Sequence, residues 1–236
     1  MACDPSNPEA SDSPSCSLPP FRLFDAEAEV RIVERRLPHW SQAGTLCFIT
    51  FRTHDSMPRE VLDQWHADRT RWLAHHGVNA RDPQWRGQLD KLGPKVAREF
   101  LDIFWNRWHD ALDAGHGDCL LRQPALSQVV AESLSHFDGE RYELLDYVVM
   151  PNHVHLLAAF PDEEAMLQQC DSWKHYTAAQ INRRLGWRGR FWQTDGFDHL
   201  VRSQAQFEYL RRYIGENPSR ARLREGEFMH YSKPLP

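Results

Sequence analysis

Two strongly β-forming segments follow one another in this chain with only two residues between them. The first runs from Tyr142 to Met150 and the second from His153 to Phe160, and both are rich in β-branched, aromatic and aliphatic residues. The pair Pro151-Asn152 between them is typical of a tight turn. Because strands joined by so short a connection pair antiparallel, the sequence predicts a β-hairpin and restricts the fold to those with an antiparallel sheet.

Further strands and helices flank this hairpin in a regular order. A strand is expected over Thr45–Arg52, after the turn-like Ala43-Gly44, and another within Phe191–Val201. Helices are expected over 124–137, from about 163 or 171 to 185, and over 204–216, with Pro218 ending the last of them. The resulting βαββαβ order predicts an α+β fold, a ferredoxin-like antiparallel sheet with helices on one face.

A long helical region separates the first of these strands from the rest. Helical spacing of apolar residues begins after Pro58, and a second helix is expected from about Pro94 to Ala114, before Gly115 and Gly117. We therefore predict a helical insertion over about 53–117 within a single domain of residues 21–224. Residues 1–20 have the composition of a disordered leader, and residues 225–236 are expected to form a C-terminal tail.

Composition and targeting signals narrow the class of protein. A hydrophobic fraction of 41% is that of a folded globular chain. No apolar run approaches the roughly 18 residues of a membrane span, and residues 1–20 lack the apolar core of a signal peptide. The five cysteines are scattered, odd in number and free of any Cys-x-x-Cys pair, which argues against disulfides and a cysteine zinc site. We expect a cytoplasmic protein without a membrane partner, associated with the nucleoid if it is bacterial.

The distribution of charge is uneven although the net charge is −5. Residues 171–224 contain eleven Lys and Arg and five Asp and Glu, a local charge of +6, so the rest of the chain carries −11. A basic segment in an otherwise acidic chain can bind the phosphate groups of a nucleic acid. A solvated helix face is the alternative interpretation.

The second strand of the hairpin opens with His153-Val154-His155. Residues two apart on a strand point to the same face, so the two imidazoles are expected side by side, with Val154 pointing into the core. Two neutral imidazoles on rigid backbone can form half of a divalent-metal site. With thirteen histidines in the chain, a His-x-His spacing also arises by chance, and two hydrogen-bonded structural histidines remain an alternative.

A second group of residues stands near the C-terminus, in Tyr213-Ile214-Gly215-Glu216-Asn217-Pro218. Residues four apart on a helix share a face, so the Tyr213 hydroxyl and the Asn217 amide are expected to project together. An amide oxygen can complete a two-histidine site for a hard cation, and a tyrosine beside that cation is a plausible nucleophile. Alternatively, Tyr213 is an aromatic residue packed on the sheet, and Asn217 is part of an ordinary helix end.

Taken together, the strings VVMPNHVHLL and YIGENP resemble the single-tyrosine HUH transposases, in particular the REP-associated tyrosine transposases and the insertion-sequence transposases related to them. The resemblance extends over nearly all of the chain after the leader, through RRLPHW, FITFR, SWKHYTAAQINRR and RFWQTDGFDHLVR. It implies that His153 and His155 are metal ligands, Asn217 the third ligand and Tyr213 the nucleophile. The insertion at 53–117 departs from the smallest members of the family.

The resemblance implies a metal-dependent endonuclease and strand transferase that cuts single-stranded or hairpin DNA through a covalent 5′-phosphotyrosine. Mg²⁺ and Mn²⁺ both suit the expected ligands, and monomer and homodimer both stay open. Tyr209 and Tyr176 are the rival tyrosines, but Tyr209 has no side-chain amide four residues further on, and Tyr176 lies on the preceding helix. The basic residues expected to contact DNA are Lys174, Arg183, Arg184, Arg188, Arg190, Arg202, Arg211 and Arg212.

Two other functions fit the same residues. In a metal-dependent hydrolase, His153 and His155 would bind a zinc ion that activates water, and Tyr213 would be dispensable. In a domesticated hairpin-binding protein, the chain would bind DNA without cutting it. Replacing Tyr213 with Phe separates the three functions, because only the transposase loses cleavage through it.

Overall fold

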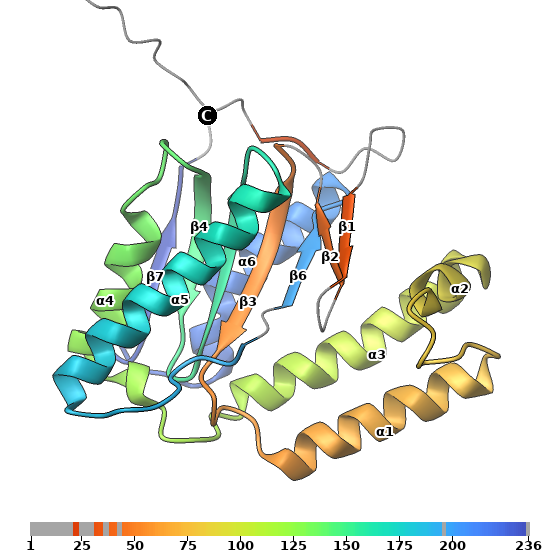
Figure 1. The fold of residues 1–236 in the computed structure, drawn as a ribbon, viewed down its shortest axis with the longest axis horizontal. Helices are drawn as coiled ribbons and strands as arrows, with labels where there is room; N and C mark the ends of the chain where they lie inside the picture. Colours follow the sequence, from red (N-terminus) through yellow and green to blue (C-terminus); the bar gives the residue numbers. More distant parts are fainter. Residues whose placement is uncertain (1–20, 24–30, 35–37, 42–43, 195–196, 235–236) are drawn as a thin grey trace, which may run out of the picture.

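The structure is a computed structural model that describes residues 21–23, 31–34, 38–41, 44–194 and 197–234. The proposed leader, residues 1–20, lies outside the described residues. The centre of the molecule is a five-stranded sheet with helices packed on it, and a helical arm extends from one side (Figure 1). The elements of the sheet are β3 (Leu46–Arg52), β4 (Glu143–Val149), β5 (His153–Ala159), β6 (Phe197–Leu200) and β7 (Met229–Ser232).

The strand order is β6-β3-β5-β4-β7, and every neighbouring pair is antiparallel. The hairpin predicted from the sequence is present, with Val149 opposite Val154 across the turn. Without β7, the order of the four remaining strands is that of a ferredoxin-like βαββαβ fold, which confirms the predicted α+β class. The segment 225–236, expected as a tail, adds β7 to the edge of the sheet beside β4.

One face of the sheet carries α4 (Pro124–Ser135) and α5 (Glu163–Leu185). The larger core cluster lies here and joins alternate residues of the strands, such as Ile49 and Val154, to Val130 of α4 and Trp173 of α5. Both helices connect strands of the sheet, as the predicted order requires. The side chain of Val154 is in this core, as expected from its position between two histidines.

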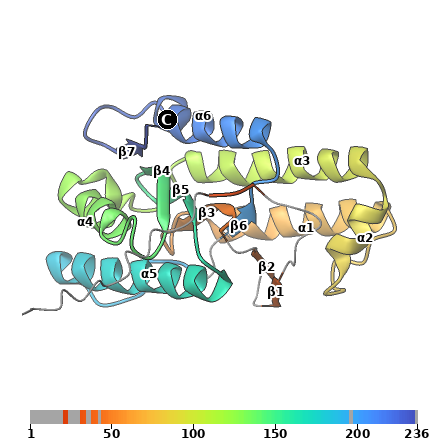
Figure 2. The same cartoon turned by 90° about the horizontal axis from the view of Figure 1, so that it is seen from above.

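The expectation that helices cover only one face is wrong. The helix α6 (Gln204–Arg220) packs against the opposite face, where Phe207, Leu210 and Ile214 form a second core cluster with Phe48 and other strand residues. Figure 2 shows the sheet between α6 on one side and α4 and α5 on the other. The reason is that both faces of these strands are apolar, so each needs a cover.

The end of α6 also differs from the sequence-based expectation. Pro218 was expected to end the helix, but α6 continues through it to Arg220. A proline in the last turn removes one backbone donor, and the turn is completed by bonds from Ala221 to Asn217 and from Leu223 to Pro218. Asn217 is consequently held inside a regular helix, one turn after Tyr213.

The predicted insertion forms the arm of the molecule. It comprises α1 (Arg59–His75), α2 (Trp85–Lys91) and α3 (Pro94–Asp113), which share a separate aromatic core. The arm projects away from the sheet, but the C-terminal end of α3 returns to it beside α6 (Figures 1 and 2). A short two-stranded ribbon, β1 (Arg31–Glu34) with β2 (Pro38–Ser41), and the 3₁₀ turn η1 (Leu120–Arg122) complete the fold.

Two simpler expectations can be compared with the described residues. Cys47, Cys119 and Cys170, the cysteines within the described part of the chain, form no disulfide with one another. None of the helices in the described ranges is long and apolar enough to cross a membrane.

Candidate active site

The two histidines lie side by side at the start of β5, on the face covered by α6. His153 is paired in register with Arg52 at the end of β3, and His155 with Thr50. Both imidazoles are fully buried, and their ring centroids are 4.5 Å apart. The alternation of side chains along a strand therefore places them as predicted.

Hydrogen bonds orient both imidazoles in the same way. His153 Nδ1 lies 2.7 Å from the Asn152 Oδ1, which can only accept, so Nδ1 carries the proton and Nε2 has a lone pair. His155 Nδ1 lies 2.7 Å from the Thr50 hydroxyl, which leaves its Nε2 directed to the site in the same manner. Burial lowers the pKa of His153 to about 3 and the pKa of His155 well below its usual range, so both rings are neutral at pH 7.

Tyr213 brings its hydroxyl directly to this pair. Its oxygen lies 3.3 Å from Nε2 of His155, and only 4% of the residue is exposed. Burial raises the pKa of the hydroxyl far above its usual range. Tyr209 stacks on Tyr213 with its ring 6.4 Å away but is 42% exposed, and Tyr176 on α5 is 54% exposed. Among the three candidate tyrosines, therefore, Tyr213 is the one beside the histidines.

Asn217 lies one turn after Tyr213 on α6 and is completely buried. Its Nδ2 donates to both carboxylate oxygens of Asp113, at 3.2 and 3.4 Å. Its Oδ1 is buried without a hydrogen-bond partner among the described residues, and so is Nε2 of His153. Unpaired buried acceptors are costly, which makes these two atoms the notable feature of the site.

Asp113 is the last residue of α3 and reaches the site from the insertion. Its Oδ1 lies 3.6 Å from Nε2 of His153, and one ligand-type atom from each of Asp113, His153 and His155 lies within 4.8 Å of the others. Burial raises the pKa of the Asp113 carboxyl to about 6. One turn earlier, His109 places its ring 5.2 Å from that of His155 and 5.5 Å from that of Tyr213.

The sequence analysis did not single out Asp113, His109, Thr50 or Asn152 as site residues. Strand register gives a signal for Thr50, since it lies opposite His155. Asn152 precedes His153 directly, within the predicted turn. For Asp113 and His109 the sequence holds no comparable signal, because their approach to the hairpin depends on how the insertion packs.

Most of the arginines expected to contact DNA are exposed. The exposed ones are Arg183, Arg184, Arg188, Arg190, Arg202 and Arg212. Those at the end of α5 and in the loop after it lie at the end of the sheet where β5 begins, because His54, just beyond β3, donates to the backbone carbonyl of Phe191 in this loop. Trp187 in the same loop is 38% exposed and lies 5.5 Å from the His54 ring. Positive charge and an exposed indole therefore gather at this end of the sheet.

The expected DNA contacts include Arg211, Lys174 and Arg184, each of which has a side-chain bond within the protein. Arg211 forms a two-pronged ion pair with the buried Asp146, at 2.8 and 3.1 Å, and also donates to Ser232. Lys174 donates to the carbonyl of Thr194 at 2.8 Å, and Arg184 donates to the carbonyl of Ala125. The side chain of Arg211 in particular ties α6 to β4 and β7.

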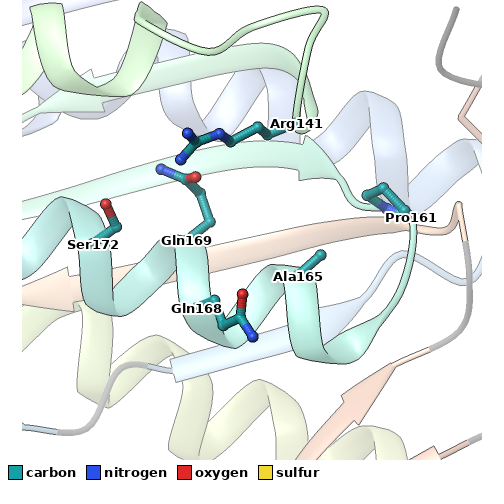
Figure 3. Close-up of a pocket in the computed structure, with 6 residues that line it drawn as sticks. All are labelled: Arg141, Pro161, Ala165, Gln168, Gln169 and Ser172. Atoms are coloured by element: carbon teal, nitrogen blue, oxygen red, sulfur yellow. The ribbon is translucent and has the colours of Figure 1, made fainter. Parts of the chain in front are cut away.

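A pocket of about 470 Å³ lies elsewhere, at the start of α5. Arg141, Pro161 and Gln169 are among its lining residues (Figure 3). It is at the far end of β5 from His153, and Arg141, the ionisable residue among the described residues that line it, lies over the Phe137 ring. It contains no combination of nucleophile, base and ligand, so the chemistry is to be sought at the histidines.

The donor atoms of the histidine site suit a divalent cation. One ligand-type atom from each of His153, His155 and the partly buried Asp113 lies within 4.8 Å of the others, and Asn217, which donates to Asp113, has an Oδ1 without a hydrogen-bond partner among the described residues. Imidazole nitrogens with amide and carboxylate oxygens bind Mn²⁺ and Mg²⁺ as well as zinc. The buried acceptors without partners are the observation that a cation would satisfy.

Comparison with known proteins gives a family for the segment that carries these residues. Residues 122–217, less than half of the chain, match the family described as IS200-like transposase. A solved structure of a REP-associated tyrosine transposase bound to a REP hairpin is 14% identical, with a TM-score of 0.37 over 76% of this chain and 69% of that one. No curated protein matches. The segment with His153, His155, Tyr213 and Asn217 thus matches the IS200-like transposase family, which agrees with the resemblance found in the sequence.

Proposed function

We propose that this protein is a metal-dependent single-strand DNA endonuclease and strand transferase that works through a covalent 5′-phosphotyrosine on Tyr213. His153, His155 and Asn217 would hold the cation, Mg²⁺ or Mn²⁺. The observation that carries the proposal is the approach of the Tyr213 hydroxyl to Nε2 of His155, beside the His153 ring; Nε2 of His153 and Oδ1 of Asn217 are buried without hydrogen-bond partners in the part of the chain that the structure describes. A nucleophile and the donors for a cation are thereby brought together within one chain.

The reaction is a transesterification that conserves a phosphodiester bond. The Tyr213 oxygen forms a bond to phosphorus, the bond from phosphorus to the 3′ oxygen breaks, and the phenolic proton is transferred, in net terms, to the released 3′ oxygen. A 3′-hydroxyl reverses these steps and rejoins the strand, so no nucleotide cofactor is needed. When bound, the cation supplies positive charge that polarises the phosphate and favours the phenolate.

The high pKa of Tyr213 agrees with this requirement for activation. At its ordinary pKa a tyrosine is about one part in a thousand ionised at pH 7, and burial moves it further from ionisation. Positive charge beside the hydroxyl offsets that effect. Within the protein, Arg220 is the cation next to Tyr213, at 5.5 Å from its ring, and is half exposed. Arg220 is suited to hold the scissile phosphate at the mouth of the site.

The substrate that suits the site is single-stranded or hairpin DNA, in the cytoplasm of the cell. A scissile phosphate has to reach a phenolic oxygen held against a sheet, which a paired strand in a regular duplex cannot do. The exposed Arg188 and Arg190 with Trp187 are placed to bind the adjoining strand through phosphate contacts and base stacking. Lys174 and Arg211, which have internal partners, are not part of this surface.

The test is covalent capture of labelled single-stranded DNA. Hairpin oligonucleotides labelled on the 3′ side of the cut are incubated with the protein and Mg²⁺ or Mn²⁺, then separated on a denaturing protein gel. We expect a labelled protein band that EDTA and Tyr213→Phe abolish. Tyr209→Phe is the matched control, because Tyr209 is one turn away, stacked on Tyr213 and exposed. It should keep the band.

Two outcomes would support other functions. Cleaved DNA without a protein-bound label, unchanged in Tyr213→Phe, would contradict the proposal and favour a hydrolase that uses water. Hairpin binding without cleavage, under conditions in which the protein binds Mn²⁺, would favour a binding protein that no longer cuts.

A further inference from the structure

We infer that Asp113, at the end of the insertion helix α3, is a fourth ligand of the cation held by His153, His155 and Asn217. The insertion is then a part of the active site that completes the metal centre. The inference rests on the proposed function, since it concerns the same cation. It adds a residue from outside the segment that matches the transposase family, which begins at residue 122.

The first observation is the position of the carboxylate. Oδ1 of Asp113 lies 3.6 Å from Nε2 of His153, which is too long for a hydrogen bond. It is slightly wider than the separation of two neighbouring ligands around a cation with bonds of about 2.1 Å. The His153 nitrogen is buried and has no hydrogen-bond partner in the described part of the chain. Two donor atoms therefore face each other across a space that suits a cation.

The second observation is the arrangement of Asn217. Its Nδ2 donates to both carboxylate oxygens of Asp113, and its Oδ1 is buried without a hydrogen-bond partner within the described ranges. Asp113 thus orients one proposed ligand and offers its own oxygen as another. The two roles make different predictions, because orientation of Asn217 requires Asn217 to be present whereas direct binding does not.

The third observation is the way in which the end of α3 is anchored. Asn152, whose Oδ1 orients His153, donates through its Nδ2 to the carbonyl of His116 at 2.9 Å. On the other side, the backbone of Asp118 donates to Asp55, which follows β3, at 2.7 Å. The same asparagine therefore ties the loop after Asp113 to the histidine strand. Asp113 is held in place by contacts independent of Asn217.

The electrostatic setting of Asp113 also calls for a cation. The carboxylate is 12% exposed and sits at the C-terminal end of α3, where the helix dipole is negative. A negative charge is unfavourable there unless a positive charge lies close by, and Arg220, which is half exposed and also pairs with Asp110, supplies part of that charge. Two neutral imidazoles and an amide contribute no charge to a cation, so Asp113 would supply the negative charge that hard cations such as Mn²⁺ prefer.

The test measures Mn²⁺ binding by calorimetry, on the full chain stripped with EDTA and without DNA. The variants are Asp113→Asn, Asn217→Ala and the two combined. The matched control is Asp110→Asn, one turn earlier on α3, which removes the same charge from a side chain that is 67% exposed. We expect Asp113→Asn to weaken Mn²⁺ binding by roughly 100-fold or more, whereas Asp110→Asn changes it by less than about threefold.

The combined variant distinguishes a ligand from a positioning residue. A ligand weakens binding by a similar factor whether or not Asn217 is present. A loss that disappears in the Asn217→Ala background would overturn the inference, and so would an unchanged affinity in Asp113→Asn. Should Asp113→Asn fail to fold, as judged by its melting curve, Asp113→Ser provides the same comparison with a smaller side chain.

Failure of this inference is distinct from failure of the proposed function. If the native protein bound no Mn²⁺ and formed no covalent DNA adduct, both would be overturned. If the native protein bound Mn²⁺ and formed the adduct while Asp113→Asn bound Mn²⁺ equally well, only the role of Asp113 would be overturned.

Discussion

The hydroxyl of Tyr213 lies 3.3 Å from Nε2 of His155, the atom through which this histidine would bind a cation. In the proposed mechanism the hydroxyl and the cation therefore compete for one lone pair, because Nδ1 of His155 already faces Thr50. The Tyr213 hydroxyl is therefore expected to affect the affinity of this site for a cation.

Tyr213→Phe should bind Mn²⁺ at least as tightly as the native protein. The substitution removes the competing hydroxyl and keeps the buried ring, so Nε2 of His155 becomes available without cost. Calorimetric titration of the EDTA-stripped protein checks this. Weaker binding by more than about threefold would mean that the phenolic oxygen is itself part of the metal site.

Thr50→Val should weaken Mn²⁺ binding by roughly 10-fold to 100-fold, the usual effect of removing a partner of a metal-binding histidine. Valine has nearly the shape of threonine, and position 50 is 2% exposed, so packing is conserved while Nδ1 of His155 loses its partner. Thr50→Ser retains the hydroxyl and should restore most of the affinity. Equal affinities for the valine and serine variants would contradict this role.

Gly117→Ala should destabilise the protein by about 2 kcal/mol or more. The residue has a φ of +84°, and a Cβ there would lie 2.7 Å from the backbone oxygen of Asp55. Gly139 is the matched control, with a φ of +81° and no atom within 4 Å of an added Cβ. Chemical denaturation of both variants should show the larger loss for Gly117→Ala. A loss no larger than that of Gly139→Ala would show that the loop after α3 adapts freely.

Arg211→Ala should lower the free energy of unfolding by about 3 kcal/mol, because it leaves the buried Asp146 without its ionic partner and, among the described residues, with only the Ser232 hydroxyl as a side-chain donor to its carboxylate. Arg212→Ala, at the exposed neighbouring position, should change it by less than about 0.5 kcal/mol. Urea denaturation provides the comparison. If Arg211→Ala were as stable as Arg212→Ala and bound DNA more weakly, Arg211 would belong to the DNA-binding surface after all.

The stability of the protein in EDTA should fall between pH 7 and pH 5. Burial lowers the pKa of His109 to about 4 and that of His153 to about 3, and the pKa of His155 is also lowered. In the unfolded chain these histidines take up protons near pH 6.5, whereas in the folded chain they stay neutral to a lower pH. Acid therefore favours the unfolded state, so the free energy of unfolding is highest above pH 6.5 and falls below it. The pKa of the Asp113 carboxyl is raised to about 6, so its protonation on acidification favours the folded state and offsets part of the loss of stability.

Urea midpoints at the two pH values measure this dependence, and His109→Phe isolates one contributor. Phenylalanine keeps an aromatic ring against Trp105 and Phe48 but cannot take up a proton, so the variant should lose less stability on acidification. A stability that did not change between pH 7 and pH 5 would be inconsistent with buried, neutral histidines.

Much of the fold and part of the site could be read from the sequence because the signals are local. Alternation along β5 puts His153 and His155 on one face, and helical spacing puts Tyr213 and Asn217 together. The turn at Pro151-Asn152 gives the central hairpin of the sheet. Each of these relations spans a few residues, so neighbouring positions in the chain determine it.

The tertiary structure alone decided which of these groups meet and what completes them. In the tertiary structure α6 lies on the face opposite α4 and α5, so that Tyr213 lies against His155, and α6 continues through Pro218. The tertiary structure also brings Asp113 to within 3.6 Å of His153, although the insertion has no pattern that points to the hairpin. Contacts between distant segments depend on how whole surfaces pack, and packing is a property of the assembled core that no local pattern contains.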